Sequence, residues 1–264
     1  MQDLFFEIHQ GEGPFIATAI HEGNKLREEL ISLINPDEDE RLREEDPYTG
    51  IWADIANTTI KGKYSRFETD LNRPRDKAVY KTPDDAWGLQ VWKKELPDSA
   101  VQRSLEKYDK FYSEVKKVIE KKIFEYGGVL IYDFHSYNHR REGRDNPAEN
   151  PAKNPEINIG TKNMNRAKWN DVINTFIRLM SSFDYSGRKL DVRENIKFKG
   201  GYFSQWIYEN YPEKSCVLAI EVKKFFMDEW TGVPDYEQIY LLKNAFKKTV
   251  WPVIDEFQKI LNQN

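Results

Sequence analysis

The sequence predicts an α/β protein with a single domain, in which a mixed, mainly parallel sheet is flanked by helices. Short apolar runs of strand length alternate along the chain with longer segments whose apolar residues recur every three to four positions. No shift in composition marks a linker, so residues 1–264 are taken as one domain. Hydrophobic residues make up 39% of the 264 positions and aromatic residues 14%, which is enough for a substantial core.

Three apolar runs predict strands buried in the sheet, and the segments between and after them predict helices. The strands are expected at residues 14–20 (PFIATAI), 129–134 (VLIYDF) and 217–222 (VLAIEV). Helices are expected at residues 23–34, 98–126, 168–180, 204–211 and 236–261. Gly127 and Pro212 are expected to end the second and fourth of these helices, and Pro252 to kink the last. Two long polar segments, residues 35–49 and 142–156, are expected to be loops.

Charge and cysteine content exclude several classes of protein. Lys and Arg number 40 against 44 Asp and Glu, so nothing in the net charge of −4 favours a nucleic-acid or acidic-membrane partner. Cys216 is the one cysteine, which excludes a disulfide framework and a thiolate zinc cluster. No apolar stretch reaches the roughly 20 residues of a membrane span, and no signal peptide is recognised, so a cytoplasmic protein is expected.

Polar residues stand at the ends of all three predicted strands. His21 and Glu22 follow the first strand, Asp133 and His135 end the second, and Glu221 interrupts the third. Because ligands of α/β sheets bind at the carboxyl ends of strands, a functional site is expected there. The simpler alternative is that each residue makes a structural hydrogen bond.

Only four histidines are available for imidazole chemistry: His9, His21, His135 and His139. Two of them follow predicted strands, and a catalytic zinc commonly takes two histidines and one carboxylate. The carboxylates near them in the sequence are Glu22, Glu45, Asp46 and Asp133, of which Asp133 would alternatively orient His135. His139 is expected in a loop or near substrate, and His9 has no expected role.

Two further features suit the chemistry of a hydrolase. A buried Glu221 is expected either to pair with a cation such as Lys223 or to act as a general base with a raised pKa. Residues 64–80 place Arg66, Asn72, Arg73 and Arg75 close together in the sequence. The planar guanidinium group of an arginine can form two hydrogen bonds with a substrate carboxylate. The alternative for this segment is a solvated basic loop balanced by Glu68 and Asp70.

The order of these motifs resembles the N-formylglutamate amidohydrolase family. The chain shows His21 after a strand, then SRFETDLNRP, DFHS and GGYF, and then an apolar strand with Glu221. The same order of motifs occurs in the wider group of zinc carboxypeptidases and aspartoacylases. The resemblance covers about residues 14–225. It implies a zinc-carboxypeptidase-like (phosphorylase/hydrolase-like) fold with one Zn²⁺, for which another divalent ion can substitute.

The resemblance also implies a role for each matching residue. His21 and His135 would bind the metal, and Glu221 would activate water. Asn72 and Arg73 would hold the carboxylate of the substrate, with Arg66 near the scissile carbonyl. Gly200, Gly201 and Tyr202 would form a loop beside the substrate.

The third metal ligand is where the chain departs from the wider group. That group has a glutamate three residues after its first histidine, and this position is Asn24 here. The family pattern instead places an acidic residue in a later segment, which corresponds to EEDPYTG. Asp46 is therefore the expected third ligand, with Glu22 and Glu45 as alternatives.

The implied reaction is hydrolysis of the amide of a small N-acylated acidic amino acid. The expected substrate is N-formyl-L-glutamate, giving L-glutamate and formate as in histidine catabolism. One alternative is a related zinc peptidase or deacylase acting on a peptide or cell-wall fragment. Others are a binding protein that has lost the metal, and an interaction module suggested by Trp87, Trp92, Trp206 and Trp230.

Overall fold

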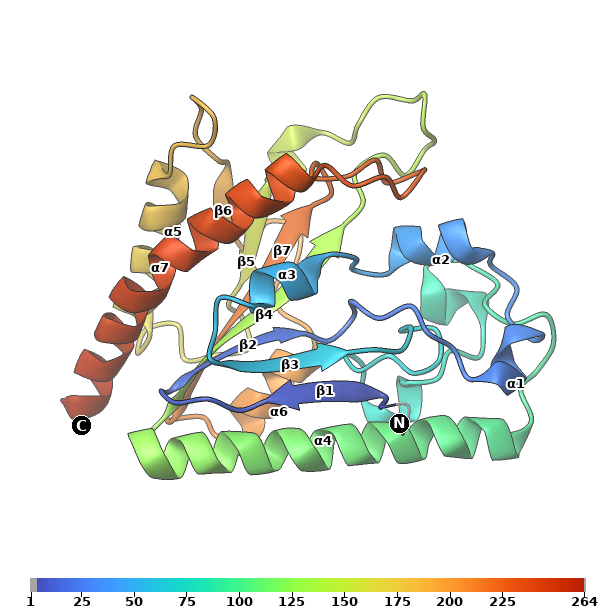
Figure 1. Ribbon diagram of the computed structural model, residues 1–264, viewed down its shortest axis with the longest axis horizontal. Coiled ribbons are helices and arrows are strands. Elements are labelled where there is room, and N and C mark those ends of the chain that lie inside the picture. Colours follow the sequence, from blue (N-terminus) through green and yellow to red (C-terminus); the bar gives the residue numbers. More distant parts are fainter. Residues whose placement is uncertain (1–3, 264) are drawn as a thin grey trace.

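The computed structural model describes residues 4–263, which form a seven-stranded sheet with helices on both faces (Figure 1). The strands are β1 (Phe6–His9), β2 (Phe15–Ala19), β3 (Thr58–Gly62), β4 (Val129–Tyr137), β5 (Ile157–Gly160), β6 (Val192–Glu194) and β7 (Ser215–Lys223). Their order is β1-β3-β2-β4-β7-β5-β6. The pairs β2–β3, β2–β4, β4–β7 and β5–β6 are parallel, whereas β1 and β5 run antiparallel to β3 and β7. The expected mixed, mainly parallel sheet is confirmed.

Helices cover the two faces of the sheet in separate layers. They are α1 (Glu28–Ile31), α2 (Glu38–Glu44), α3 (Thr49–Ala53), α4 (Asp98–Tyr126), α5 (Asn170–Ser182), α6 (Tyr202–Asn210) and α7 (Tyr236–Asn262). Figure 1 shows α4 along one side of the sheet and α7 along the other. Since side chains of a strand alternate between faces, Ile131 packs with α4 and α6, and Tyr132 packs with α5 and α7.

The long helices and buried strands agree with the sequence prediction, but the helix expected at residues 23–34 is wrong. Only Glu28–Ile31 is helical there. A Cβ on Gly23 would lie 2.2 Å from the carbonyl carbon of Lys63, and Lys25 donates its backbone N–H to the oxygen of that carbonyl. The start of the segment is therefore held extended beside residues 63–65. Helix α7 runs without a break through Pro252.

Short strands β1, β3, β5 and β6 were not foreseen, because each has few residues and no clear apolar run.

No helix within residues 4–263 has the length and hydrophobicity to cross a membrane. The expected domain of residues 1–264 includes residues 1–3 and 264, which lie outside the described part of the chain, and its extent stays a prediction.

The central strands bring the three predicted strand ends together. β2, β4 and β7 are neighbours in the sheet, and His135 on β4 lies in register with Glu221 on β7. His21 follows the last residue of β2 by two positions. The side chains of His135 and Glu221 point to the face covered by α4 and α6, because they alternate with residues of the opposite core.

Candidate active site

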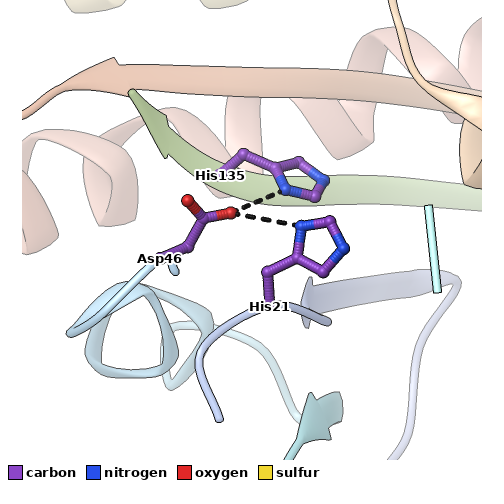
Figure 2. A group of neighbouring side chains, drawn as sticks. All are labelled: His21, Asp46 and His135. Carbon is purple, nitrogen blue, oxygen red and sulfur yellow. Dashed lines mark hydrogen bonds and ion pairs between the residues drawn. The ribbon is translucent and has the colours of Figure 1, made fainter. Parts of the chain in front are cut away.

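His21, Asp46 and His135 meet at the carboxyl end of the parallel strands (Figure 2). Oδ2 of Asp46 lies 3.0 Å from Nδ1 of His135 and 3.4 Å from Nδ1 of His21. One ligand atom from each of the three residues falls within 4.8 Å of the others, and all three side chains are buried. The structure thus brings together the three residues that the sequence proposes as metal ligands.

Backbone contacts explain how Asp46, which lies in no helix or strand, reaches this point. Its N–H donates to the carbonyl oxygen of His21 at 3.0 Å, and its own carbonyl accepts from the Thr49 hydroxyl at 2.7 Å. The hydroxyl of Ser136 donates to Oδ1 of Asp46 at 3.0 Å. The segment between α2 and α3 is therefore fixed against the ends of β2 and β4.

A second carboxylate orients each histidine. Nε2 of His135 lies 3.0 Å from Oδ2 of Asp133, whose other oxygen accepts from the Thr18 hydroxyl at 2.6 Å. Nε2 of His21 lies 2.7 Å from Oδ1 of Asp70. Both imidazoles consequently direct Nδ1 toward Asp46. The orienting role considered for Asp133 agrees with this geometry, whereas Asp70 was weighed only as a charge balancing a basic loop.

Asp70 also connects His21 to the arginine-rich segment. Its Oδ2 lies 2.8 Å from Nη2 of Arg66 and accepts from the Tyr80 hydroxyl, while Oδ1 accepts from the N–H of Asn72 at 2.8 Å. Burial acts to raise the pKa of Asp70, but Arg66 and His21 hold that pKa well below its usual value. Asp70 is thus a buried, charged carboxylate. The only sequence signal for it was its place in the DLNR motif.

The donor set fits a divalent metal ion. Although burial opposes it, hydrogen bonds from His135 and His21 keep the pKa of Asp46 far below its usual value, so the carboxylate is charged. Two imidazoles and one carboxylate are the ligands of many catalytic zinc sites, and carboxylates that orient the histidines commonly accompany them. His21, Asp46 and His135 could therefore hold a metal ion, with one donor atom from each residue.

The two alternative carboxylates lie elsewhere. The side chain of Glu22 packs against Gly50, where a Cβ would come within 2.0 Å of its carboxylate. Glu45 accepts a hydrogen bond from the Ser65 hydroxyl, and burial raises its pKa to about 7. Neither residue belongs to the group of potential ligands among residues 4–263.

Glu221 faces the same space from β7. It lines a cavity of about 620 Å³ together with His21, Asp46 and His135. Its carboxylate makes no hydrogen bond with the described residues, and burial raises its pKa to about 7. Lys223, the expected ion-pair partner, instead donates to the carbonyl of Asn154 at 3.2 Å, so the salt-bridge interpretation is wrong. An unpaired carboxylate with this pKa suits a general base.

The cavity carries more positive than negative side chains. Its cationic residues are Arg43, Arg66, Arg73, Arg141, Lys199 and Lys224, against Glu44, Asp46 and Glu221. The predicted substrate-binding residues Asn72, Arg73 and Tyr202 line it as well. A cavity of this charge favours an anionic ligand.

The predicted substrate-binding residues occupy defined places. Arg66 pairs with Asp70 and lies with its guanidinium carbon 4.7 Å from the ring centroid of Trp87. Oδ1 of Asn72 accepts from the N–H of Phe203 at 2.9 Å, which holds the first turn of α6 against the cavity. A Cβ on Gly201 would come within 2.3 Å of Asn72, so this contact requires glycine. Arg66 and Asn72 are thus held in place by contacts with the rest of the protein, unlike side chains of a solvated loop.

The two other histidines lie apart from this group. Nδ1 of His139 is 3.3 Å from Oε2 of Glu229, and His139 does not line the cavity. His9 ends β1 at the edge of the sheet. Neither supplies a potential metal ligand among the residues that the structure describes.

Comparisons with known proteins identify the family of the chain and structures with a similar fold. The model of the family described as N-formylglutamate amidohydrolase matches residues 13–227. A crystal structure of N-formylglutamate amidohydrolase from Ralstonia eutropha is similar at a TM-score of 0.74, with 16% identity over 96% of this chain and 98% of the other. A gene product of Agrobacterium tumefaciens is similar at a TM-score of 0.66, with 14% identity over 95% of this chain and 96% of the other. No curated protein sequence matches the chain.

Proposed function

Since the chain belongs to the N-formylglutamate amidohydrolase family, we propose that it is a zinc-dependent hydrolase of N-acylated acidic amino acids. The proposed reaction converts N-formyl-L-glutamate and water into L-glutamate and formate. The observation that carries the proposal is the convergence of His21, Asp46 and His135 beside the unpaired Glu221 in one cavity. The excess of cationic side chains in that cavity suits a substrate with carboxylates.

The metal would be held by Nδ1 of His21, Nδ1 of His135 and the Asp46 carboxylate. A zinc ion in such a site acidifies water and polarises a carbonyl group, which promotes attack on an amide. Asp70 and Asp133 would keep the two imidazoles in the required orientation, because each holds Nε2 and turns Nδ1 toward Asp46.

Glu221 would act as the base and then as the acid. Its carboxylate accepts a proton from the attacking water and passes a proton to the nitrogen of the breaking C–N bond. Burial raises the pKa of Glu221 above its usual value, which suits both steps because the carboxylate then accepts a proton more readily than an exposed one and can pass it on.

The arginines would bind and orient the substrate. Arg66 is held by Asp70 and Trp87, and we assign it to the oxygen of the scissile carbonyl, where charge develops during attack. Arg73, with Asn72 and Tyr202 beside it, would bind the carboxylate of the amino acid. Holding both ends of the substrate places the amide against the attacking water.

The test combines metal analysis with an assay of the same sample. We expect one equivalent of zinc in the purified protein and release of formate from N-formyl-L-glutamate, both of which a chelator removes. The variant Glu221→Gln should keep the zinc and lose the hydrolysis. A protein that hydrolyses formylglutamate after complete removal of divalent metals would refute the zinc dependence.

A further inference from the structure

A second pocket shares part of its wall with the catalytic cavity. This Trp87 pocket, of about 250 Å³, lies between residues 86–89 on one side and Glu44, Asn138, Arg141 and Glu229 on the other. Arg43, Glu44, Trp87, Asn138 and Arg141 line both the pocket and the cavity. A cavity of about 620 Å³ has room for a ligand much larger than N-formylglutamate. The cavity and the Trp87 pocket together therefore offer more space than this substrate fills.

The pocket lies on the acyl side of the amide that would be cleaved. Asn72, Arg73 and Tyr202, assigned to the amino-acid carboxylate, line the cavity but not the Trp87 pocket. Arg66, assigned to the scissile carbonyl, packs on the ring of Trp87. A group that enters the pocket would therefore continue from the carbonyl carbon, where N-formylglutamate has only a hydrogen atom.

The charged groups of the pocket are already engaged. Both oxygens of Glu229 accept backbone N–H groups, from His139 and Arg140. Glu44 lies 3.3 Å from Arg141 and 3.7 Å from Arg43. Besides these polar side chains, the walls offer the half-exposed ring of Trp87 and the side chain of Leu89, which together suit a neutral group that has both an amide and an apolar side chain.

Asn138 adds one specific polar feature. Its side chain is 2% exposed, and its amide nitrogen donates to Oε1 of Glu44 at 3.1 Å. Its amide oxygen has no hydrogen-bond partner within residues 4–263. Because buried polar atoms are rarely left unpaired, we take this oxygen as an acceptor for an N–H donor of a ligand.

We propose that the Trp87 pocket binds an aminoacyl residue, so that the preferred substrates are short peptides that end in an acidic amino acid. The inference rests on the proposed function and extends it. The apolar side chain of the penultimate residue would lie against Trp87 and Leu89, and its N–H would donate to Asn138. Water hydrolyses the last peptide bond: its oxygen joins the acyl carbon, the C–N bond breaks, and a proton from the water goes to the nitrogen of the released amino acid.

Three substrates test the proposal on the zinc-loaded protein. They are N-formyl-L-glutamate, N-formyl-L-leucyl-L-glutamate, and 4-methylpentanoyl-L-glutamate, which keeps the leucine side chain but lacks the N–H. We expect kcat/KM for glutamate release from the dipeptide to exceed that for formylglutamate by at least about tenfold. The desamino compound should fall between them, since it fills the pocket without the hydrogen bond.

Two variants separate the apolar contact from the hydrogen bond. Leu89 lines only the Trp87 pocket, so Leu89→Trp should fill the pocket, abolish the advantage of the dipeptide and leave formylglutamate hydrolysis unchanged. Leu241→Trp, a half-buried leucine on α7 that lines neither space, is the matched control. Asn138→Ala should remove the preference for the dipeptide over its desamino analogue.

Each result has a definite meaning. A dipeptide advantage that disappears in Leu89→Trp but not in Leu241→Trp supports the proposal. Hydrolysis of formylglutamate with equal or poorer hydrolysis of the dipeptide overturns it and leaves the proposed function intact. If the zinc-loaded protein hydrolyses none of the three substrates, the proposed function is wrong, and this inference is wrong with it.

Discussion

Nε2 of His21 lies 2.7 Å from Oδ1 of Asp70, although 49 positions separate the two residues in the sequence. The contact turns Nδ1 of His21 toward Asp46 and His135. Because Oδ2 of Asp70 is bound by Arg66, the same carboxylate positions one proposed metal ligand and one proposed substrate-binding residue. The metal site and the substrate site are therefore coupled through a single buried side chain.

The variant Asp70→Asn should weaken metal binding by about 10–100-fold, because an uncharged amide orients His21 less well. Competition with a chromogenic chelator measures this affinity. Asp109→Asn is the control, since Asp109 pairs with Arg75 at the surface. Equal zinc affinity in Asp70→Asn and in the unmodified protein would show that Asp70 does not position the ligand.

Zinc content should also distinguish Asp46 from Glu22 as the third ligand. Asp46→Asn should lose most of the metal, because no other carboxylate completes the group with His21 and His135 within the described residues. Glu22→Gln should retain it, since Glu22 packs against Gly50. Elemental analysis of both proteins checks this, and full zinc occupancy in Asp46→Asn would exclude Asp46 as a required ligand.

The sequence predicts the parts of the fold that a continuous pattern encodes. The helix expected at residues 98–126 agrees with α4, because its apolar spacing is unbroken and Gly127 ends it with a φ of 79°. The helix expected at residues 23–34 failed, since the backbone of Gly23 and Lys25 lies against Lys63. Contacts between segments far apart in the sequence override local spacing there, and spacing carries no information about them.

The same distinction applies to the site. His21, His135 and Glu221 were found because each stands at a strand end, and parallel strands bring such ends together. Asp70 lies in a loop, and its partners His21 and Arg66 are identified only once that loop is folded. The Trp87 pocket likewise arises from distant segments, which no local motif describes.

Arg73→Ala should raise KM for N-formyl-L-glutamate by about tenfold or more, with a smaller effect on kcat. The guanidinium lines the cavity, is 36% exposed and lies 3.9 Å from Asp70, so it is available to a substrate carboxylate. Arg75→Ala is the control, because Arg75 pairs with Asp109 at the surface. An unchanged KM in Arg73→Ala would remove this residue from the substrate site.

The rate of hydrolysis should rise with pH as Glu221 loses its proton, since only the carboxylate accepts a proton from water. Burial raises the pKa of Glu221 to about 7 in the metal-free protein, and a divalent cation nearby would lower it. The acid limb of kcat/KM is therefore expected below pH 7. Glu221→Gln should lower kcat by about 10²–10⁴-fold. An acid limb that persists unchanged in the residual activity of this variant would assign it to another group.

Lys224 should make the metal-free protein more stable as the pH rises through the alkaline range. Its ammonium is buried and donates to the carbonyl of Glu45 at 2.8 Å. Burial lowers its pKa from 10.5 to about 8, although the carboxylates of Asp46 and Glu44 act to raise it. Between these two pH values the unfolded chain holds a proton that the folded chain has lost, so unfolding takes up a proton and the free energy of unfolding increases with pH.

The variant Lys224→Met removes this contribution, and groups that do not interact with Lys224 titrate equally in both proteins. The free energy of unfolding of the unmodified protein, minus that of the variant, should grow by up to about 3 kcal/mol from pH 7.5 to 10.5. Urea denaturation at several pH values, with a chelator present, measures both curves. A difference that is constant over this range would show that Lys224 keeps an ordinary pKa, and one that falls would show that its pKa is raised. Either result would show that burial does not penalise the charge.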